Sequence, residues 1–235
     1  MDRGRSNPLK ADGKLLHPLQ QILDGFKKWD KPTNKKLPVE VDVVELLCIM
    51  GHMGYATTKD AVLGDWALIA FYDLLHIGEY TQKGSRNESK QTVEFCMMDV
   101  IFFEFDSKGR LQQMPRDASD ERVKKVAGAA LRLSNQKNGW KNVCIFHFAN
   151  GDDITCLVRA LGQRYVHIRQ HTNKKSISLS TYFVQGCKHN LKDTDIRTGL
   201  KYAAGECNYP SRGIPIERID THSLCGGGAN ALSLK

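Results

Sequence analysis

Apolar residues in the first part of the chain recur at helical spacing. Residues 41–50 (VDVVELLCIM) predict one helix, and residues 60–76 predict a longer helix that is apolar on nearly every face. A helix with no polar face has to be enclosed by the rest of the fold. A shorter amphipathic helix is predicted around residues 19–26, where apolar residues are three or four positions apart.

The middle of the chain changes to strand character. Aromatic and β-branched residues gather at 93–105, 129–134 and 143–148, and Asn138-Gly139 between the last two segments predicts a β-hairpin. Helices are then predicted over 153–170, 177–184 and 193–206. A final helix, with Thr221 as its N-cap, carries His222. This order predicts an α+β fold, mainly helical, with a small antiparallel β-sheet.

A change of composition near Pro38 divides the chain. Residues 1–37 are polar and rich in lysine, and they predict a basic arm or linker with a short helix. Residues 38–235 have enough apolar material for one domain. With 41% hydrophobic residues, the 235-residue chain is neither fibrous nor wholly disordered. The arm has two open interpretations, a solvated segment or a strap along DNA phosphates.

The balance of charged residues points to an anionic partner. Lys and Arg number 34 against 26 Asp and Glu, which gives a formal net charge of +8. A surplus of this size favours nucleic acid or an acidic protein surface.

Cysteine usage and the N-terminus bear on the compartment. Seven dispersed cysteines predict reduced thiols, and the polar N-terminal residues MDRGRSNPLK lack the apolar core of a signal peptide. The most apolar stretch, residues 66–72, is far shorter than the ~20 residues of a membrane span. We therefore expect an intracellular protein, nuclear if the source is a eukaryote, with no membrane partner.

The chain lacks the residue spacings of common metal-binding and cofactor-binding motifs. Cys144 and His147 are three residues apart on a predicted strand, where such a pair points to opposite faces, and Cys187 and His189 lack further ligands at zinc spacing. The glycines at 226–228 are not part of a nucleotide-binding motif. The sequence predicts no metal site and no small-molecule cofactor.

Two short segments carry the most specific signal. LHIGE (75–79) ends the long apolar helix, HSLC (222–225) begins the last one, and a lysine-bearing hairpin lies between them. Over residues 38–235 this ordered set resembles the catalytic domain of tyrosine recombinases, the phage-integrase-like family that breaks and rejoins DNA, in its mobile-element versions. That family has L-R-x-x-E, a hairpin lysine and H-x-L-R. The matching positions are Glu79, Lys137 (or Lys141 in a shifted register), His222, and two arginine positions occupied by His76 and Cys225.

The resemblance implies a chemistry that this chain lacks in part. In the family a tyrosine attacks a DNA phosphodiester, two arginines hold the phosphate oxygens, and the lysine protonates the leaving oxygen. Here His76 and Cys225 replace both arginines, and no tyrosine follows His222; the last one is Tyr209. By analogy with arginine fingers, each lost guanidinium costs roughly 10³–10⁵ in rate. We expect a DNA-binding domain that is catalytically inactive.

The expected partners are duplex DNA and other recombinase protomers. Candidate phosphate contacts are the basic residues Lys141, Arg159, Arg164, Arg169, Lys174, Lys175, Arg212 and Arg218. Two alternatives stay open. One is an active recombinase whose C-terminal part is missing from this sequence. The other is a non-functional mobile-element remnant in which the apolar helix 60–76 is left uncovered and promotes aggregation.

Overall fold

The computed structural model describes residues 10–11, 14–15, 36–81, 94–133 and 142–233, and it divides the chain into two compact units, Met1–Lys35 and Lys36–Lys235. In the first unit, β1 (Lys10–Ala11) and β2 (Lys14–Leu15) pair antiparallel. The predicted helix around residues 19–26 lies outside the described residues.

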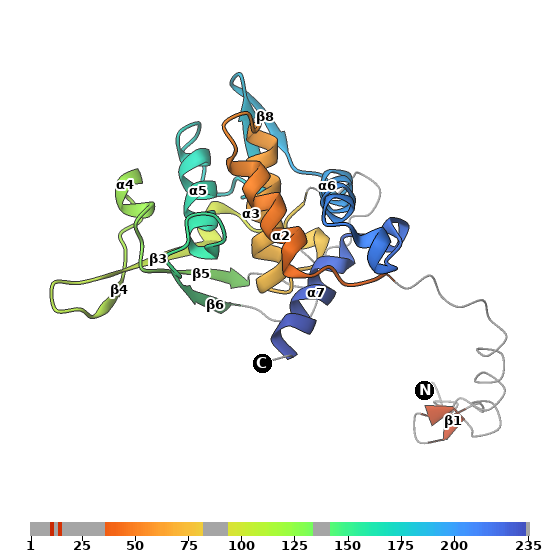
Figure 1. Cartoon of the computed structure of the whole chain (residues 1–235). Helices are drawn as coiled ribbons and strands as arrows, with labels where there is room; N and C mark the ends of the chain where they lie inside the picture. Colours follow the sequence, from red (N-terminus) through yellow and green to blue (C-terminus); the bar gives the residue numbers. More distant parts are fainter. Residues whose placement is uncertain (1–9, 12–13, 16–35, 82–93, 134–141, 234–235) are drawn as a thin grey trace, which may run out of the picture. The chain divides into compact units, whose positions relative to one another are not determined.

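The second unit combines helices with a small antiparallel sheet, as the sequence predicts (Figure 1). Its helices and strands are α2 (Val41–His52), α3 (Thr58–Tyr72), β3 (Val100–Phe105), β4 (Leu111–Gln113), α4 (Asp120–Val123), β5 (Gly128–Leu133), β6 (Val143–Phe148), α5 (Leu157–Arg169), β7 (Thr181–Val184), β8 (Cys187–Asn190), α6 (Asp193–Glu206) and α7 (His222–Ser233). Short 3₁₀ turns cover Ile77–Glu79, Met97–Asp99, Tyr209–Arg212 and Ile216–Arg218. No helix in the described ranges is both long and apolar enough to cross a membrane.

Helix α3 is the centre of the core. It begins with a capping box in which the Thr57 hydroxyl accepts from the Asp60 backbone N–H and the Asp60 carboxylate accepts from the Thr57 N–H. Residues 62–71 are all buried, because α2, α5, α6 and α7 pack around the helix. The expectation that this helix would be left uncovered is therefore wrong. It also ends at Tyr72 rather than at residue 76, since Leu74 adopts a left-handed backbone with φ 54°.

Glycines allow the helices around α3 to approach its backbone closely. A Cβ atom on Gly64 would lie 2.7 Å from the Leu47 carbonyl oxygen of α2. On α7, a Cβ on Gly227 would overlap the Val39 carbonyl oxygen, and one on Gly228 would overlap the Phe71 carbonyl oxygen of α3. The glycine run is therefore the contact surface that seats α7 on α3.

The sheet has strand order β4-β3-β5-β6, with every neighbouring pair antiparallel. The three predicted strand regions are confirmed, although the first strand begins only at Val100, after a 3₁₀ turn. Strands β5 and β6 pair from Gly128↔Phe148 to Leu133↔Val143, which confirms the predicted hairpin pairing. Helices α4 and α5 lie on one side of this sheet (Figure 1).

One predicted helix is wrong. The segment 177–184 ends in strand β7, which pairs with β8 across the turn Gln185-Gly186, where both residues have positive φ. Tyr182, Phe183 and Val184 favour extended backbone, and a two-residue turn of this kind matches the twist of a hairpin. The other helices predicted within the described residues are present, with α5 confined to Leu157–Arg169 and α6 at Asp193–Glu206.

Candidate functional site

The two recombinase-like segments meet in space. His76 follows the end of α3, His222 is the first residue of α7, and their ring centroids are 6.5 Å apart. The glycine contact between α7 and α3 makes this possible, because it holds the start of α7 beside the end of α3. Two residues that are 146 positions apart in the sequence therefore form one corner, here called the histidine corner: His76, Glu79, His222 and Cys225.

Glu79 fixes the backbone of this corner. The Glu79 carboxylate Oε2 accepts a hydrogen bond from the His76 backbone N–H at 2.7 Å, which closes the 3₁₀ turn Ile77–Glu79. The Glu79 side chain is buried, with 5% of the residue exposed. Its geometry is that of a group that positions the His76 backbone.

Cys225 contributes a neutral thiol. Burial raises its pKa, and the nearby Glu79 carboxylate raises it further. Burial likewise raises the pKa of Tyr80, with the Glu79 carboxylate adding to the effect. Where the family has an arginine, this chain therefore offers a group that carries no positive charge.

A hydrogen bond that the sequence does not predict joins β6 to the end of α3, beside the histidine corner. His147 Nε2 on β6 lies 2.5 Å from Oδ1 of Asp73, the C-cap residue of α3, three positions before His76. The Asp73 side chain is fully buried. Burial raises the Asp73 pKa, and the hydrogen bond from His147 partly offsets that rise. No pattern in the sequence predicts this pair, because it depends on how β6 packs against the end of α3.

The same strand shows that Cys144 and His147 lie as predicted, on opposite faces. Cys144 pairs with Arg132 across β5 and is exposed, whereas His147 pairs with Ala129 and reaches Asp73. The two side chains point to opposite faces. Within the described ranges no group of three or more His, Cys, Asp or Glu side chains could hold a metal ion.

The predicted hairpin lysines, Lys137 and Lys141, lie outside the described residues. Strand β5 ends at Leu133, before that segment, and strand β6 begins at Val143, after it. The position of either lysine relative to the histidine corner stays a prediction.

Tyr209, the last tyrosine of the chain, has a structural role. Its side chain is fully buried, and its hydroxyl accepts from the Glu40 backbone N–H at 2.7 Å and donates to Asp42 Oδ1 at 3.2 Å. Burial is the main cause that raises its pKa to about 12. A phenol that is neutral and doubly hydrogen-bonded is a poor nucleophile.

The predicted phosphate contacts separate into different environments. Arg164 is a correction: it is 3% exposed and lies in the core, with Nε 3.6 Å from the buried Asp65 carboxylate, so it is unavailable to a phosphate. Its side chain projects inward from α5 toward α3, because Arg164 lies on the buried face of α5.

Three other arginines are exposed or half-buried and are already paired. Arg159 binds Asp153, Arg169 binds Asp120 and the Ala118 carbonyl, and Arg212 binds Glu40 and Asp42. Lys174 and Lys175 follow the end of α5 and are exposed, and Lys175 lines an open hollow of about 630 Å³ together with Arg116 and Arg169. The lysines are the stronger candidates in this set.

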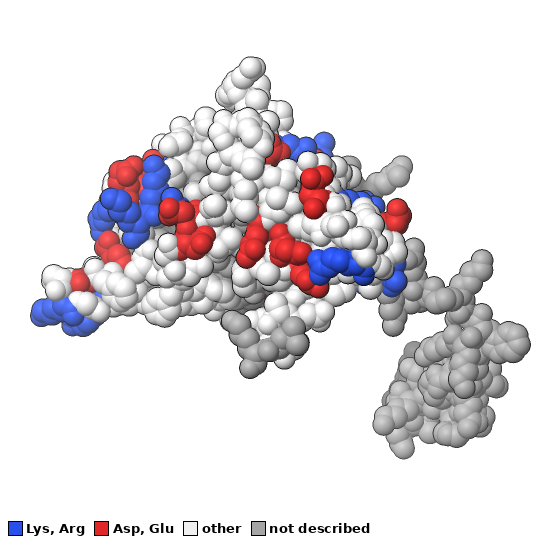
Figure 2. All heavy atoms as spheres, viewed as in Figure 1, with Lys and Arg blue, Asp and Glu red and all other residues white. Residues whose placement is uncertain are grey.

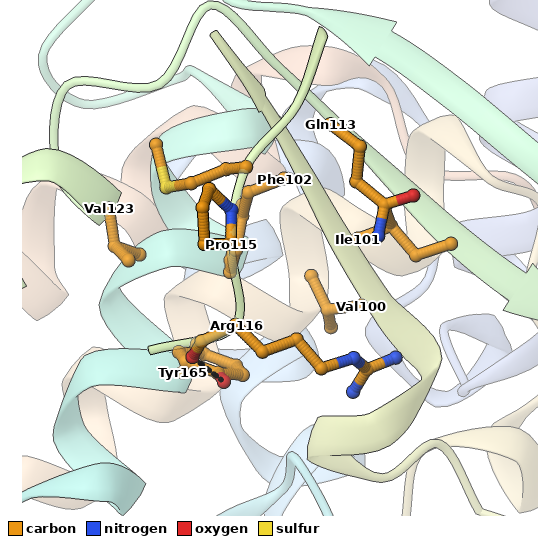
Figure 3. Close-up of a pocket in the computed structure, with 9 residues that line it drawn as sticks. Val100, Ile101, Phe102, Gln113, Pro115, Arg116, Val123 and Tyr165 are labelled. Carbon is orange, nitrogen blue, oxygen red and sulfur yellow. Dashed lines mark hydrogen bonds between the residues drawn. The ribbon is translucent and has the colours of Figure 1, made fainter. Parts of the chain in front are cut away.

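A smaller hollow nearby is part of the core. It lies between Val100, Pro115 and Tyr165 (Figure 3) and has a volume of about 10 Å³, room for no more than one water molecule. The Tyr165 hydroxyl donates to the Arg116 carbonyl oxygen at its edge, at 3.5 Å. It is too small for a ligand.

The surplus positive charge of the chain is unevenly distributed. Segments 1–9, 12–13, 16–35, 82–93, 134–141 and 234–235 hold 12 of the 34 basic residues and 5 of the 26 acidic ones, which leaves 22 basic and 21 acidic residues in the described part. On the face seen in Figure 2, basic and acidic side chains are interspersed. The described residues are therefore close to neutral as a set.

The comparisons with known proteins gave no match: no family model, no curated protein and no solved structure matches this chain. The case for a function depends on the geometry of the histidine corner and on the motifs that form it.

Proposed function

We propose that this chain is a DNA-binding domain of the DNA breaking and rejoining type that has lost the cleavage chemistry. The observation that carries the proposal is the 6.5 Å separation of the His76 and His222 rings, each at the position its motif assigns. The two motifs lie far apart in the sequence, one at the end of α3 and the other at the start of α7. In the structure these two helix ends lie next to each other.

The connection between the histidine corner and the hairpin supports the same proposal. A lysine that assists at a phosphate has to be carried on an element whose position is fixed relative to the histidines. The Asp73–His147 pair joins β6, the second strand of that hairpin, to the residue three positions before His76. The second strand of the hairpin and the end of α3 are thus joined by the Asp73–His147 hydrogen bond.

The loss of cleavage chemistry follows from what the corner lacks. A guanidinium offers a planar fork of donors with a permanent charge, which suits the oxygens of a phosphate in the transition state. His76 can donate a single hydrogen bond from a shorter ring, and the Cys225 thiol is kept neutral by burial and by Glu79. A single ring donor and a neutral thiol can hold a ground-state phosphate, but they do not supply the two permanent charges that cleavage needs.

Charge placement identifies where affinity for DNA would come from. Segment 82–93 begins two residues after Tyr80 and carries Lys83, Arg86 and Lys90 against Glu88. Segment 134–141 carries Lys137 and Lys141 between β5 and β6. Both segments adjoin elements of the histidine corner and its hairpin in the sequence, and phosphate contacts of this kind give a salt-dependent affinity with little sequence preference.

The test is duplex binding by the full chain, measured by fluorescence anisotropy at about 50 and 200 mM salt. We expect binding that weakens steeply with salt, and a double variant Lys137→Ala/Lys141→Ala that weakens it further and lowers the salt slope by about two. Lys125→Ala is the matched control. Lys125 is exposed and lies between α4 and the start of β5, whereas Lys137 and Lys141 follow the end of β5 in the sequence. Equal losses in the control and the double variant would contradict the proposed surface.

A second assay tests the chemistry. The chain is incubated with duplex DNA carrying a nick or a bridging phosphorothiolate, and a covalent protein–DNA adduct is sought on denaturing gels. We expect none, and restoring the arginines as His76→Arg/Cys225→Arg should raise duplex affinity. A covalent adduct formed by the unmodified chain would overturn the inactive assignment while leaving DNA binding intact.

A further inference from the structure

One face of the four-stranded sheet is open. Register and alternation place a set of side chains on the face opposite α4 and α5, with aromatic residues prominent among them. This open face consists of Ile101, Phe103, Phe105, Leu111, Gln113, Ala130, Arg132, Cys144, Phe146 and Phe148. Within the described residues no helix packs on it.

The phenylalanine rings form a connected row on this face. The Phe103 and Phe146 rings have centroids 5.2 Å apart, and those of Phe146 and Phe148 are 4.8 Å apart, both edge to face. Phe148 is 62% exposed and Phe105 58% exposed. The small residue Gly128 lies under the row, since a Cβ there would be 2.7 Å from Cζ of Phe146. The sheet thus presents a row of aromatic rings, of which Phe148 is the most accessible to solvent.

Positive charge gathers at one end of the row. Arg116 and Arg132 each donate from Nη2 to the Met98 carbonyl oxygen, at 3.2 and 3.3 Å, so two guanidinium groups share one acceptor. The Met98 backbone N–H donates to the Lys175 carbonyl oxygen, so the Lys175 backbone also lies next to Met98. Figure 3 shows the Arg116 side chain extending past Val100, with Ile101 and Gln113 side by side on β3 and β4.

Arg132 links the charge to the rings. It lies on the open face opposite Cys144, and Phe146 is two residues farther along the same strand. Among the described residues Arg132 pairs with the Asp99 carboxylate, with Nη2 3.3 Å from Oδ1, and its buried Nε has no hydrogen-bond partner there. Two guanidinium groups beside a single carboxylate leave a local surplus of positive charge, and their remaining N–H groups suit the oxygens of a phosphate.

We propose that the open face binds single-stranded nucleic acid, with bases on the Phe146 and Phe148 rings and a backbone phosphate at Arg132 and Arg116. Sheets that present aromatic side chains to solvent hold unpaired bases by stacking, and every base has a π-face to offer. The site is separate from the histidine corner and independent of the function proposed there.

The size of the face argues against a second copy of the chain as the occupant. Two phenylalanines that are each about 60% exposed offer roughly 200–300 Å² of apolar area. A stable protein interface buries about 800 Å² on each partner. Paired guanidinium groups at the end of a short ring row suit an alternating base-and-phosphate ligand better than an apolar protein surface.

The test uses the full chain and a fluorescein-labelled oligothymidylate of about 12 nucleotides, followed by anisotropy. Phe148→Ala should weaken binding about tenfold, the loss expected for one stacking contact. Arg132→Gln should weaken binding and lower the salt slope by about one. The matched control is Tyr202→Ala on α6, because Tyr202 is 54% exposed and α6 packs against α2 and α3 rather than the sheet.

Three further readouts decide the result. Unfolding temperatures should be unchanged in Phe148→Ala, since the ring is mostly in solvent. Duplex affinity should also be unchanged in that variant, which separates this site from the function proposed above. Oligothymidylate affinity that is the same in Phe148→Ala and the unmodified chain would overturn the proposal. So would a dimer of the unmodified chain that Phe148→Ala converts to a monomer, because the face would then belong to a second copy.

Discussion

The surroundings of α3 are closely packed, whereas the open face of the sheet is largely exposed to solvent. Around α3, backbones touch through glycines, ten consecutive residues are buried, and a charged pair is sealed inside. On the open face, Phe105 and Phe148 are more than half exposed and the Arg132 guanidinium keeps an unpartnered nitrogen in the described part of the chain. Substitutions around α3 should therefore change stability, whereas substitutions on the open face should change binding alone.

The largest effect is expected from the buried pair of Arg164 and Asp65. Arg164→Met leaves the Asp65 carboxylate buried without its partner, and we expect a loss of about 3–5 kcal/mol in the free energy of unfolding. The double variant Asp65→Leu/Arg164→Met should recover most of it, because it removes both charges. Chemical denaturation of the two variants measures the difference. Should the single variant be as stable as the unmodified chain, the interior would tolerate an unpaired charge, and the contrast with the open face would fail.

A second effect concerns the glycine contact of α7. Gly228→Ala places a Cβ against the Phe71 carbonyl oxygen and 2.8 Å from Cδ2 of Leu74, so α7 must move away from α3 at a cost of about 1–3 kcal/mol. Gly226→Ala is the control, because its Cβ would come no closer than 3.7 Å to Pro38 and alanine favours helix. Thermal unfolding should separate the two variants. Equal stability in both would mean that close backbone contact does not hold α7 in place.

The smallest effect depends on pH. His167 Nε2 accepts from the Phe183 backbone N–H at 3.2 Å, and burial, with help from Arg164 and His171, lowers the His167 pKa to about 4. The unfolded chain therefore binds a proton near pH 6.5 that the folded chain refuses until about pH 4, so stability falls as the pH falls through this window. Since the ring is half-buried, we expect about 1–2 kcal/mol.

The variant His167→Gln isolates this contribution. Burial raises the pKa of Asp65 and Asp73, which favours stability at lower pH, so the difference between variant and unmodified chain is the quantity to measure. Stability followed by urea denaturation from pH 7 to pH 4 should fall less steeply in His167→Gln. Parallel curves would show that His167 takes up its proton in the folded state as readily as in the unfolded chain.

Sequence patterns predicted the elements that depend on local periodicity. The apolar run predicted α3, and the runs of strand-forming residues at 129–134 and 143–148 predicted β5 and β6, because each is determined by neighbours along the chain. The predicted Asn138-Gly139 turn lies outside the described residues. The same reasoning missed the hairpin of β7 and β8, although Gln185-Gly186 after three strand-forming residues is a recognisable turn signal. The helix predicted at 177–184 follows from apolar spacing alone and takes no account of the turn-forming residues after it.

Long-range pairs were beyond the reach of periodicity. Arg164 was predicted as a surface cation because its partner, Asp65, lies 99 positions earlier in a run of apolar residues. The Asp73–His147 pair required the packing of a strand against a helix end. The meeting of His76 and His222 was expected only through a resemblance of motifs, which carries spatial information that composition does not.

The packing of α7 on α3 also has a consequence for folding during protein synthesis. The apolar surface of α3 leaves the ribosome early, whereas the glycines that cover part of it belong to the last described helix, more than 150 positions later. At about 5–20 residues per second, the nascent chain exposes that surface for roughly ten seconds or longer before α7 can dock. A chaperone that binds apolar helical segments has this interval in which to act, and the yield of folded protein in cells should depend on it.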